Sequence, residues 1–138
     1  MRVLGIDPGT GRCGFGVVEK HGTTITPVNY GVIETYKDQS DLERLNIVYE
    51  GIAELIATYR PAFMGVETLY FNTNITTGIK VAQQLTGYGR ADKKQVIEMV
   101  KRMMHITKKI DPDDAADALA IGLTAIYRVE HKNWTSGG

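Results

Sequence analysis

Aspartates crowd the start of one apolar segment of the chain, residues 111–126. The acids are Asp111, Asp113, Asp114 and Asp117. From residue 118 to 126 every side chain is apolar or small except Thr124, and the segment contains no Lys or Arg. Burying a carboxylate costs several kcal/mol unless an opposite charge or hydrogen bonds compensate it. The segment therefore predicts a buried helix whose first turns hold acids beside a cation.

The spacing of these acids separates two interpretations. Pro112 and Asp113 suit the first positions of a helix, and Asp114 and Asp117, three residues apart, would project from one face. Acids in a first turn can simply complement the helix dipole, which explains Asp113 and Asp114. That explanation fits Asp117 poorly, because it lies one turn further in and apolar residues follow it directly. We interpret Asp114 and Asp117 as a carboxylate pair that binds a cation.

Two further acids follow short apolar runs. Residues 2–6 predict a buried strand that ends before Asp7, and residues 63–66 are typical of a fully buried parallel strand that ends before Glu67. Open α/β sheets bind ligands beyond the carboxyl ends of their strands. Either acid alone could be merely exposed to solvent. Together with the helical pair, they predict one site formed by Asp7, Glu67, Asp114 and Asp117.

The elements that must position these acids follow from the apolar periodicity. Strands near residues 2–6, 15–18 and 25–36 predict an antiparallel meander. Ser40 and Glu43 form a capping box that begins an amphipathic helix ending near Tyr59. The residues expected to pack this helix on the sheet are Leu42, Leu45, Tyr49, Ile52, Ile56 and Tyr59. The spacing predicts a short helix over residues 76–85 and another from residue 92 to about 104. Residues 130–138 show no period, which predicts an irregular tail.

Length and composition limit the classes of protein. At 138 residues and 43% hydrophobic composition, the chain can bury one core, so we expect a single domain over residues 1–138. The single cysteine, Cys13, excludes an internal disulfide and a cysteine zinc site. No apolar run approaches the ~20 residues of a membrane span, and the first residues lack a signal-peptide pattern. We expect a cytoplasmic protein.

Charge is unevenly distributed. The formal net charge is 0, so total charge gives no reason to expect nucleic acid binding. Residues 90–109, however, contain seven basic residues against two acidic ones: Arg90, Lys93, Lys94, Lys101, Arg102, Lys108 and Lys109 against Asp92 and Glu98. Taken alone, this segment could be a solvated helix face.

Two adjacent aromatic residues, Tyr70 and Phe71, lie in the polar segment after Glu67. Because two neighbours on a strand cannot both face inward, at least one of these rings is expected to be exposed.

Several motifs together resemble the RuvC family of Holliday junction resolvases. They are Gly5-Ile-Asp7-Pro-Gly-Thr10, Val66-Glu67, Gly87-Tyr-Gly-Arg-Ala-Asp-Lys-Lys94 and Asp113-Asp-Ala-Ala-Asp117-Ala-Leu-Ala-Ile121. The match covers almost the whole chain in order. The resemblance implies a ribonuclease H-like α/β fold, a mixed sheet with helices on both faces. It also implies an endonuclease that cuts four-way DNA junctions symmetrically as a homodimer in recombination and repair, with branch-migration proteins of the Ruv system as partners.

The family pattern also assigns roles to residues. It implies that Asp7, Glu67, Asp114 and Asp117 are the catalytic acids and hold two Mg²⁺ ions, for which Mn²⁺ would substitute. Its junction-probing aromatic matches Tyr70, with Phe71 beside it, and one DNA-contacting lysine matches Lys93. The DNA-binding set expected on these grounds and on the basic segment is Tyr70, Phe71, Arg90, Lys93, Lys94, Lys101 and Arg102.

The chain departs from the family in one place. Between the regions matching residues 81–83 and 85–87 it lacks roughly 25 residues, about one short βα unit. Either the protein lacks this segment or the numbering passes over it. The sheet is therefore expected to be short of one edge strand. In the family, part of the dimer interface and a second DNA-contacting lysine fall in this gap.

Two other functions fit part of the pattern. A module that binds junctions without cutting them would keep Tyr70 and Lys93, but it would have lost acids, and none of the four is lost. An actin-like or sugar-kinase-like nucleotide-binding domain would explain residues 7–11 as a phosphate loop. Such proteins need a second lobe, for which 138 residues leave no room.

Overall fold

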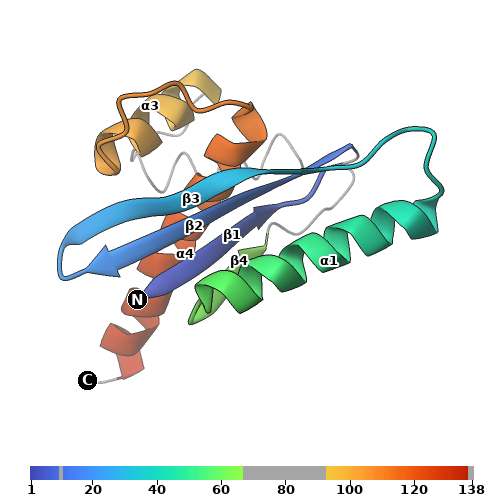
Figure 1. Ribbon diagram of the computed structural model, residues 1–138. Coiled ribbons are helices and arrows are strands. Elements are labelled where there is room, and N and C mark those ends of the chain that lie inside the picture. Colours follow the sequence, from blue (N-terminus) through green and yellow to red (C-terminus); the bar gives the residue numbers. More distant parts are fainter. Residues whose placement is uncertain (10, 67–92, 137–138) are drawn as a thin grey trace.

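A four-stranded mixed sheet organises the fold. The computed structural model describes residues 1–9, 11–66 and 93–136. The strands, in the spatial order β3-β2-β1-β4, are β1 (Arg2–Asp7), β2 (Arg12–His21), β3 (Thr24–Glu34) and β4 (Phe63–Val66). The helix α1 (Asp41–Tyr59) covers one face, and α4 (Asp113–Ser136) crosses the other with α3 (Lys93–Met103) packed beside it (Figure 1). The predicted mixed sheet with helices on both faces is confirmed.

Strand pairing brings the two predicted strand ends to the same edge. β1 pairs antiparallel with β2, from Arg2 opposite Glu19 to Asp7 opposite Gly14. β4 pairs parallel with β1, with Val66 opposite Ile6. Because parallel strands end at a common edge, Asp7 lies at the edge where β4 also ends.

Side chains of β1 alternate between two cores, as the pleat of a strand requires. Val3 packs with residues of α3 and α4 in one cluster, whereas Leu4 and Ile6 pack with Val17 and the inner residues of α1 in the other. Asp7 falls in register with Val3 and Gly5, so its side chain belongs to the face covered by α4.

The predicted capping box at the start of α1 is present. The Ser40 hydroxyl oxygen accepts a hydrogen bond from the Glu43 backbone N–H at 3.1 Å, and the Glu43 carboxylate accepts one from the Ser40 N–H at 3.1 Å. The helix ends at Arg60, which adopts a left-handed conformation with φ of 46°. A single left-handed residue is a common way to end a helix because its N–H bonds back to the last turn, here to the Ile56 carbonyl oxygen.

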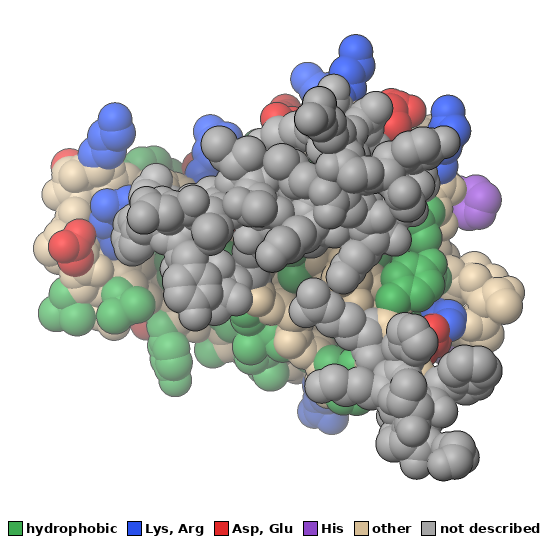
Figure 2. Space-filling model, turned by 180° about the vertical axis from the view of Figure 1, so that it is seen from behind, with side chains coloured by type: hydrophobic (Ala, Val, Ile, Leu, Met, Phe, Trp, Pro, Cys, Tyr) green, Lys and Arg blue, Asp and Glu red, His purple; other side chains and the backbone are tan. Residues whose placement is uncertain are grey.

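The face of α1 that packs on the sheet is rotated by part of a helical turn from the predicted face, so that prediction is wrong. The residues that contact the sheet core are Val48, Ile52, Leu55 and Tyr59. Four of the six residues predicted to do so are exposed, namely Leu42, Leu45, Tyr49 and Ile56, at 68%, 65%, 71% and 42%. Hydrophobic side chains line the edge of the molecule that α1 occupies (Figure 2). The two rows are neighbours around the helix, and helical spacing alone does not distinguish them.

Two other expectations need correction. β4 is parallel to β1 as predicted, but Phe63, Met64 and Val66 are 45%, 48% and 52% exposed instead of fully buried. Among the described residues β4 pairs with β1 alone, so it is an edge strand. The tail predicted to be irregular from residue 130 is helical, because α4 continues to Ser136.

The corrected face of α1 predicts a contrast between two substitutions. Ile52→Ala should lower the free energy of unfolding by about 2 kcal/mol, because it removes methylene groups packed against Leu4 and Val17. Leu45→Ala, in the same helix, should change it by less than about 0.5 kcal/mol, because Leu45 is mostly exposed. Urea denaturation followed by circular dichroism measures both. If both substitutions lower the free energy of unfolding equally, the packing face predicted from the sequence, which includes Leu45, would be correct.

Candidate metal centre

Three of the four predicted acids converge in space. Asp7, Asp114 and Asp117 each offer a carboxylate oxygen, and these oxygens all lie within 4.8 Å of one another. All three residues are half-buried. Asp7 is the last residue of β1, and the other two lie in the first turns of α4. The spacing of three residues places Asp114 and Asp117 on one helix face, as the sequence predicts.

Glycines in β1 and β2 allow α4 to approach the sheet closely enough to form this cluster. A Cβ atom at Gly5 would lie 2.7 Å from the Gly122 nitrogen, and one at Gly16 would lie 2.8 Å from the Leu119 nitrogen. A Cβ at Gly14 would lie 2.8 Å from the Asp114 carbonyl carbon and closer still to its oxygen. The backbone of α4 therefore rests directly on the backbone of the two strands.

The rest of α4 is held by burial on several sides. Its fully buried side chains include Ala115, Ala116, Leu119 and Leu123. Thr124, the one polar residue of the apolar run, donates a hydrogen bond from Oγ1 to the Ala120 carbonyl oxygen at 2.9 Å. Its hydroxyl group is thus satisfied within the helix. Because the helix is fixed in this way, Asp114 and Asp117 are held at the rim of the core instead of swinging freely.

The negative charge of the cluster affects the pKa of a neighbouring thiol, that of Cys13. Burial, and to a smaller extent the carboxylates of Asp7 and Asp114, raise the pKa of the Cys13 thiol from 9.0 to about 11. Cys13 packs in the apolar cluster beneath α1 and does not belong to the metal-binding group found among the described residues. The donors that converge are carboxylate oxygens, which suit hard cations such as Mg²⁺, Mn²⁺ and Ca²⁺. The residues present fit such an ion.

Two aspartates of the same segment play a different part. Asp111 and Asp113 are exposed, and neither belongs to the metal-binding group found among the described residues. Asp113 lies in the first turn of α4, where an acid stabilises the helix through its dipole. The dipole interpretation therefore applies to Asp113, while the cluster accounts for Asp114 and Asp117.

Several predicted site residues lie outside the described residues. They are Glu67, Tyr70, Phe71 and Arg90. Lys93 begins α3, but its side chain is not among those described. Lys94 and Arg102 are exposed and Lys101 is half-buried, so α3 presents charge on its outer side. Val100 and Met104 are buried, as the apolar periodicity of this helix predicts.

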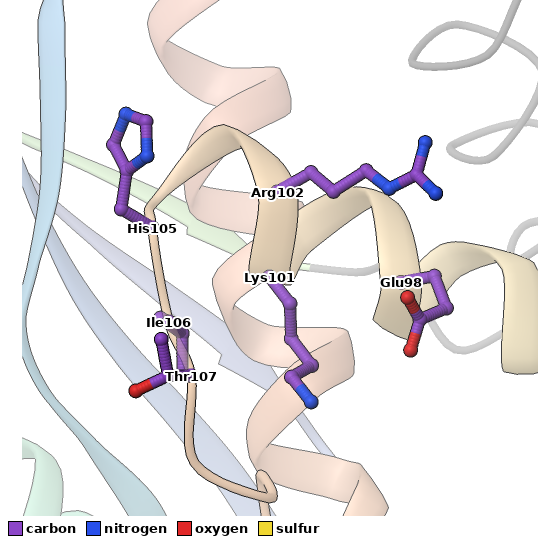
Figure 3. Close-up of a pocket in the computed structure, with 6 residues that line it drawn as sticks. All are labelled: Glu98, Lys101, Arg102, His105, Ile106 and Thr107. Carbon is purple, nitrogen blue, oxygen red and sulfur yellow. The ribbon is translucent and has the colours of Figure 1, made fainter.

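The basic residues at the two ends of α3 lie in different surroundings. Lys101 and Arg102 lie in its last turn, where cations stabilise the dipole. With Glu98, His105, Ile106 and Thr107 they line an open pocket of about 520 Å³, and their side chains diverge within it (Figure 3). Lys94 lies near the other end of the described part of α3, where its side chain is exposed.

Sequence reasoning missed the glycines that position the acids. Gly14 and Gly16 alternate with Phe15 and Val17 in β2, and a strand with one glycine-lined face is a signal of close backbone approach. That signal is present in the sequence. Which helix approaches, and at which residue, depends on tertiary packing.

Within the described parts of the chain, none of the helices combines the length and apolar character needed to cross a membrane.

Comparison with known proteins agrees with this geometry. The sequence pattern of the family described as crossover junction endodeoxyribonuclease RuvC matches residues 3–85 and 81–125. The crossover junction endodeoxyribonuclease RuvC of Brevibacillus brevis is 40% identical over 150 residues, covering 90% of each chain. That of Fusobacterium nucleatum is 40% identical over 158 residues, covering 96% of this chain and 83% of the relative. Both alignments are longer than the 138 residues of this chain, so the relatives contain residues that it lacks.

The solved structures agree as well. The structure described as "T. thermophilus RuvC in complex with Holliday junction substrate" superposes with a TM-score of 0.83 at 26% identity, covering 96% of each chain. The family match divides at residues 81–85, where the sequence predicts the missing segment. With matches that run from residue 3 to residue 125 and relatives 40% identical across nine-tenths of the chain, this protein belongs to the RuvC family of crossover junction endodeoxyribonucleases.

Proposed function

We propose that the protein is a divalent-metal-dependent endonuclease that resolves four-way DNA junctions by phosphodiester hydrolysis during recombination and repair. The observation that carries this proposal is the convergence of Asp7, Asp114 and Asp117 within 4.8 Å. Carboxylates this close repel one another when ionised, and a cation between them relieves the repulsion. The names of the relatives and of the solved structure support the same activity.

The acids would hold two Mg²⁺ ions, for which Mn²⁺ would substitute. In this proposal Asp7, Asp114 and Asp117 would supply ligands to the ions, together with Glu67, which lies outside the described residues. When bound, a pair of such ions activates a water nucleophile and neutralises the charge that develops on the leaving oxygen. The half-burial of the three described acids keeps their carboxylates oriented and reduces screening by water.

The start of α3 would bind the DNA backbone. The described part of α3 begins with Lys93 and Lys94 and ends with Lys101 and Arg102 in its last turn. Basic side chains of this kind neutralise DNA phosphates, whatever the sequence of the DNA. In this proposal Lys93, Lys94 and Arg90, of which Arg90 lies outside the described residues, would contact phosphates, and Lys101 and Arg102 would contact others along the helix.

Two copies of the chain would act together. A four-way junction is resolved by paired cuts, and we propose that residues 1–138 form a single nuclease domain that works as a homodimer with branch-migration proteins of the Ruv system. The single-domain part of this proposal is supported by coverage, because the chain covers 90% of the Brevibacillus protein and 83% of the Fusobacterium protein. The homodimer and the Ruv partners follow from the family resemblance of the sequence. Sedimentation of the protein with and without a junction measures the stoichiometry directly.

The metal centre predicts that, of two neighbouring aspartates, only one is needed for cleavage. Millimolar Mg²⁺ should raise the melting temperature, because it relieves repulsion among the clustered carboxylates. Asp114→Asn should then reduce junction cleavage by more than about a hundredfold while junction binding persists. Asp113→Asn is the matched control and should cleave normally, since Asp113 is exposed and outside the cluster. Normal cleavage by Asp114→Asn, measured on a labelled junction, would remove the two-metal proposal.

The α3 terminus predicts a change in the salt dependence of DNA binding. Lys94→Gln should lower the slope of log affinity against log salt by about one unit, because one phosphate contact is lost. Lys37→Gln removes the same charge from an exposed residue between β3 and α1 and should leave the slope unchanged. Fluorescence anisotropy over a salt series measures both slopes. Identical slopes for the two variants would mean that α3 presents only a solvated face.

The aromatic pair predicts selectivity for junctions. Bases at a crossover are already partly unstacked, so a ring can stack on them for about 1–3 kcal/mol. Tyr70→Ala should weaken junction binding about tenfold to a hundredfold and barely change duplex binding. Phe71→Ala should instead lower thermal stability, because two neighbouring rings cannot both face inward and the sequence leads us to expect Phe71 to be the inward one. If the two variants exchange these effects, Phe71 is the residue that contacts the junction.

A further inference from the structure

We infer that Gly14 is a positioning residue of the acidic cluster: its missing side chain lets the Asp114 backbone lie against β2, opposite Asp7, and thereby sets the separation of the carboxylates. The inference rests on the proposed metal-dependent function. It concerns the affinity and selectivity for the ion, which the fold alone does not determine.

The strand register places Gly14 directly across from Asp7. Residues opposite one another in an antiparallel pair project to the same face of the sheet. A side chain at Gly14 would therefore project beside that of Asp7, into the space between β2 and α4. That space is filled by the Asp114 backbone, because a Cβ built on Gly14 would meet the Asp114 carbonyl group and would lie 3.2 Å from the Asp114 Cβ.

The atoms that a Cβ would meet cannot rotate away. Separations under 3.0 Å are essentially never observed for real Cβ atoms, and a Cβ on Gly14 would lie only 2.8 Å from the Asp114 carbonyl carbon. Both the oxygen and the carbon belong to the helix backbone. Relief therefore requires the first turn of α4 to move away from β2, and Asp114 would move with it while Asp7 stays on β1.

Other glycines of the sheet contact different parts of the helix. Gly16 meets Leu119, and Gly5 meets Ala118 and Gly122. Among the glycines on these strands, only Gly14 meets an acid of the cluster. Gly11 has open space around its Cβ position. A substitution at Gly14 should thus displace the start of α4 locally, while Gly5 and Gly16 still hold the remainder of the helix.

Ion chemistry makes the displacement measurable. Mg²⁺ requires near-ideal octahedral geometry with oxygens at about 2.0–2.1 Å, whereas Ca²⁺ accepts variable geometry at about 2.3–2.6 Å. Moving Asp114 away from Asp7 should widen the cluster. Gly14→Ala should therefore lower Mg²⁺ affinity by about tenfold or more and lower Ca²⁺ affinity by a smaller factor, so that the ratio of the two affinities changes.

Isothermal titration with Mg²⁺ and with Ca²⁺ tests the inference on wild type, Gly14→Ala, Gly16→Ala and Gly11→Ala. Gly16→Ala should lower the melting temperature without changing the Mg²⁺-to-Ca²⁺ affinity ratio, because its clash lies at Leu119. Gly11→Ala should match wild type both in melting temperature and in the Mg²⁺-to-Ca²⁺ affinity ratio. A general loss of stability would not alter the ion ratio, so this readout separates positioning of the acids from support of the fold.

The outcomes separate this inference from the proposed function. If wild type binds neither ion, the metal-dependent function fails. If wild type binds Mg²⁺ and Gly14→Ala has the same ion ratio, the positioning role of Gly14 is overturned. If Gly14→Ala does not fold in buffer, the titrations are repeated in trimethylamine N-oxide, which favours compact states. Failure to fold there as well would make Gly14 a requirement of the fold and would also overturn the inference.

Discussion

Direct contact between the backbone of α4 and the backbones of β1 and β2 is the constraint on which the rest of the structure depends. Gly5, Gly14 and Gly16 remove the side chains that would separate helix from sheet. On the helix side, the carbonyl group of Ala118 and the backbone of Gly122 face Gly5, and Ala118 is fully buried. Small residues on both surfaces shorten the distance between the layers. The carboxylates at the start of the helix consequently lie level with the end of β1.

This closeness also couples the acidic cluster to the basic helix. Val100 and Met104, at the end of α3, pack in one core with Ala116 and Leu119 of α4. Ile110, in the connection between the two helices, is buried in the same core. Packed interiors transmit displacement because they contain few voids. Apolar packing therefore fixes the position of α3 relative to the acids at the start of α4, and DNA that binds α3 as we propose would share that fixed position.

Most of the fold can be predicted from the sequence because its strongest signals are local. The capping box of Ser40 and Glu43, the apolar runs before Asp7 and residue 67, and the spacing of Asp114 and Asp117 each lie within a few residues. The predicted face of α1 is wrong because two apolar rows are adjacent, and only the contact with the sheet decides between them. The exposure of β4 depends on what lies beside it, which a four-residue run does not encode. The role of Gly14 requires the register between β1 and β2.

The exposed row on α1 has a consequence for the behaviour of the protein in solution. Leu42, Leu45 and Tyr49 are mostly exposed, and Met64 and Val66 are half-exposed on the edge strand β4. Proteins at high concentration associate through exposed clusters of apolar side chains and through strands that are paired on one side only. Sulfate salts strengthen such association, and cooling weakens it. The protein should therefore stay unassociated when it is stored cold, at low concentration and in chloride instead of sulfate. In crystals grown from sulfate, the exposed rows of α1 from neighbouring molecules should contact each other.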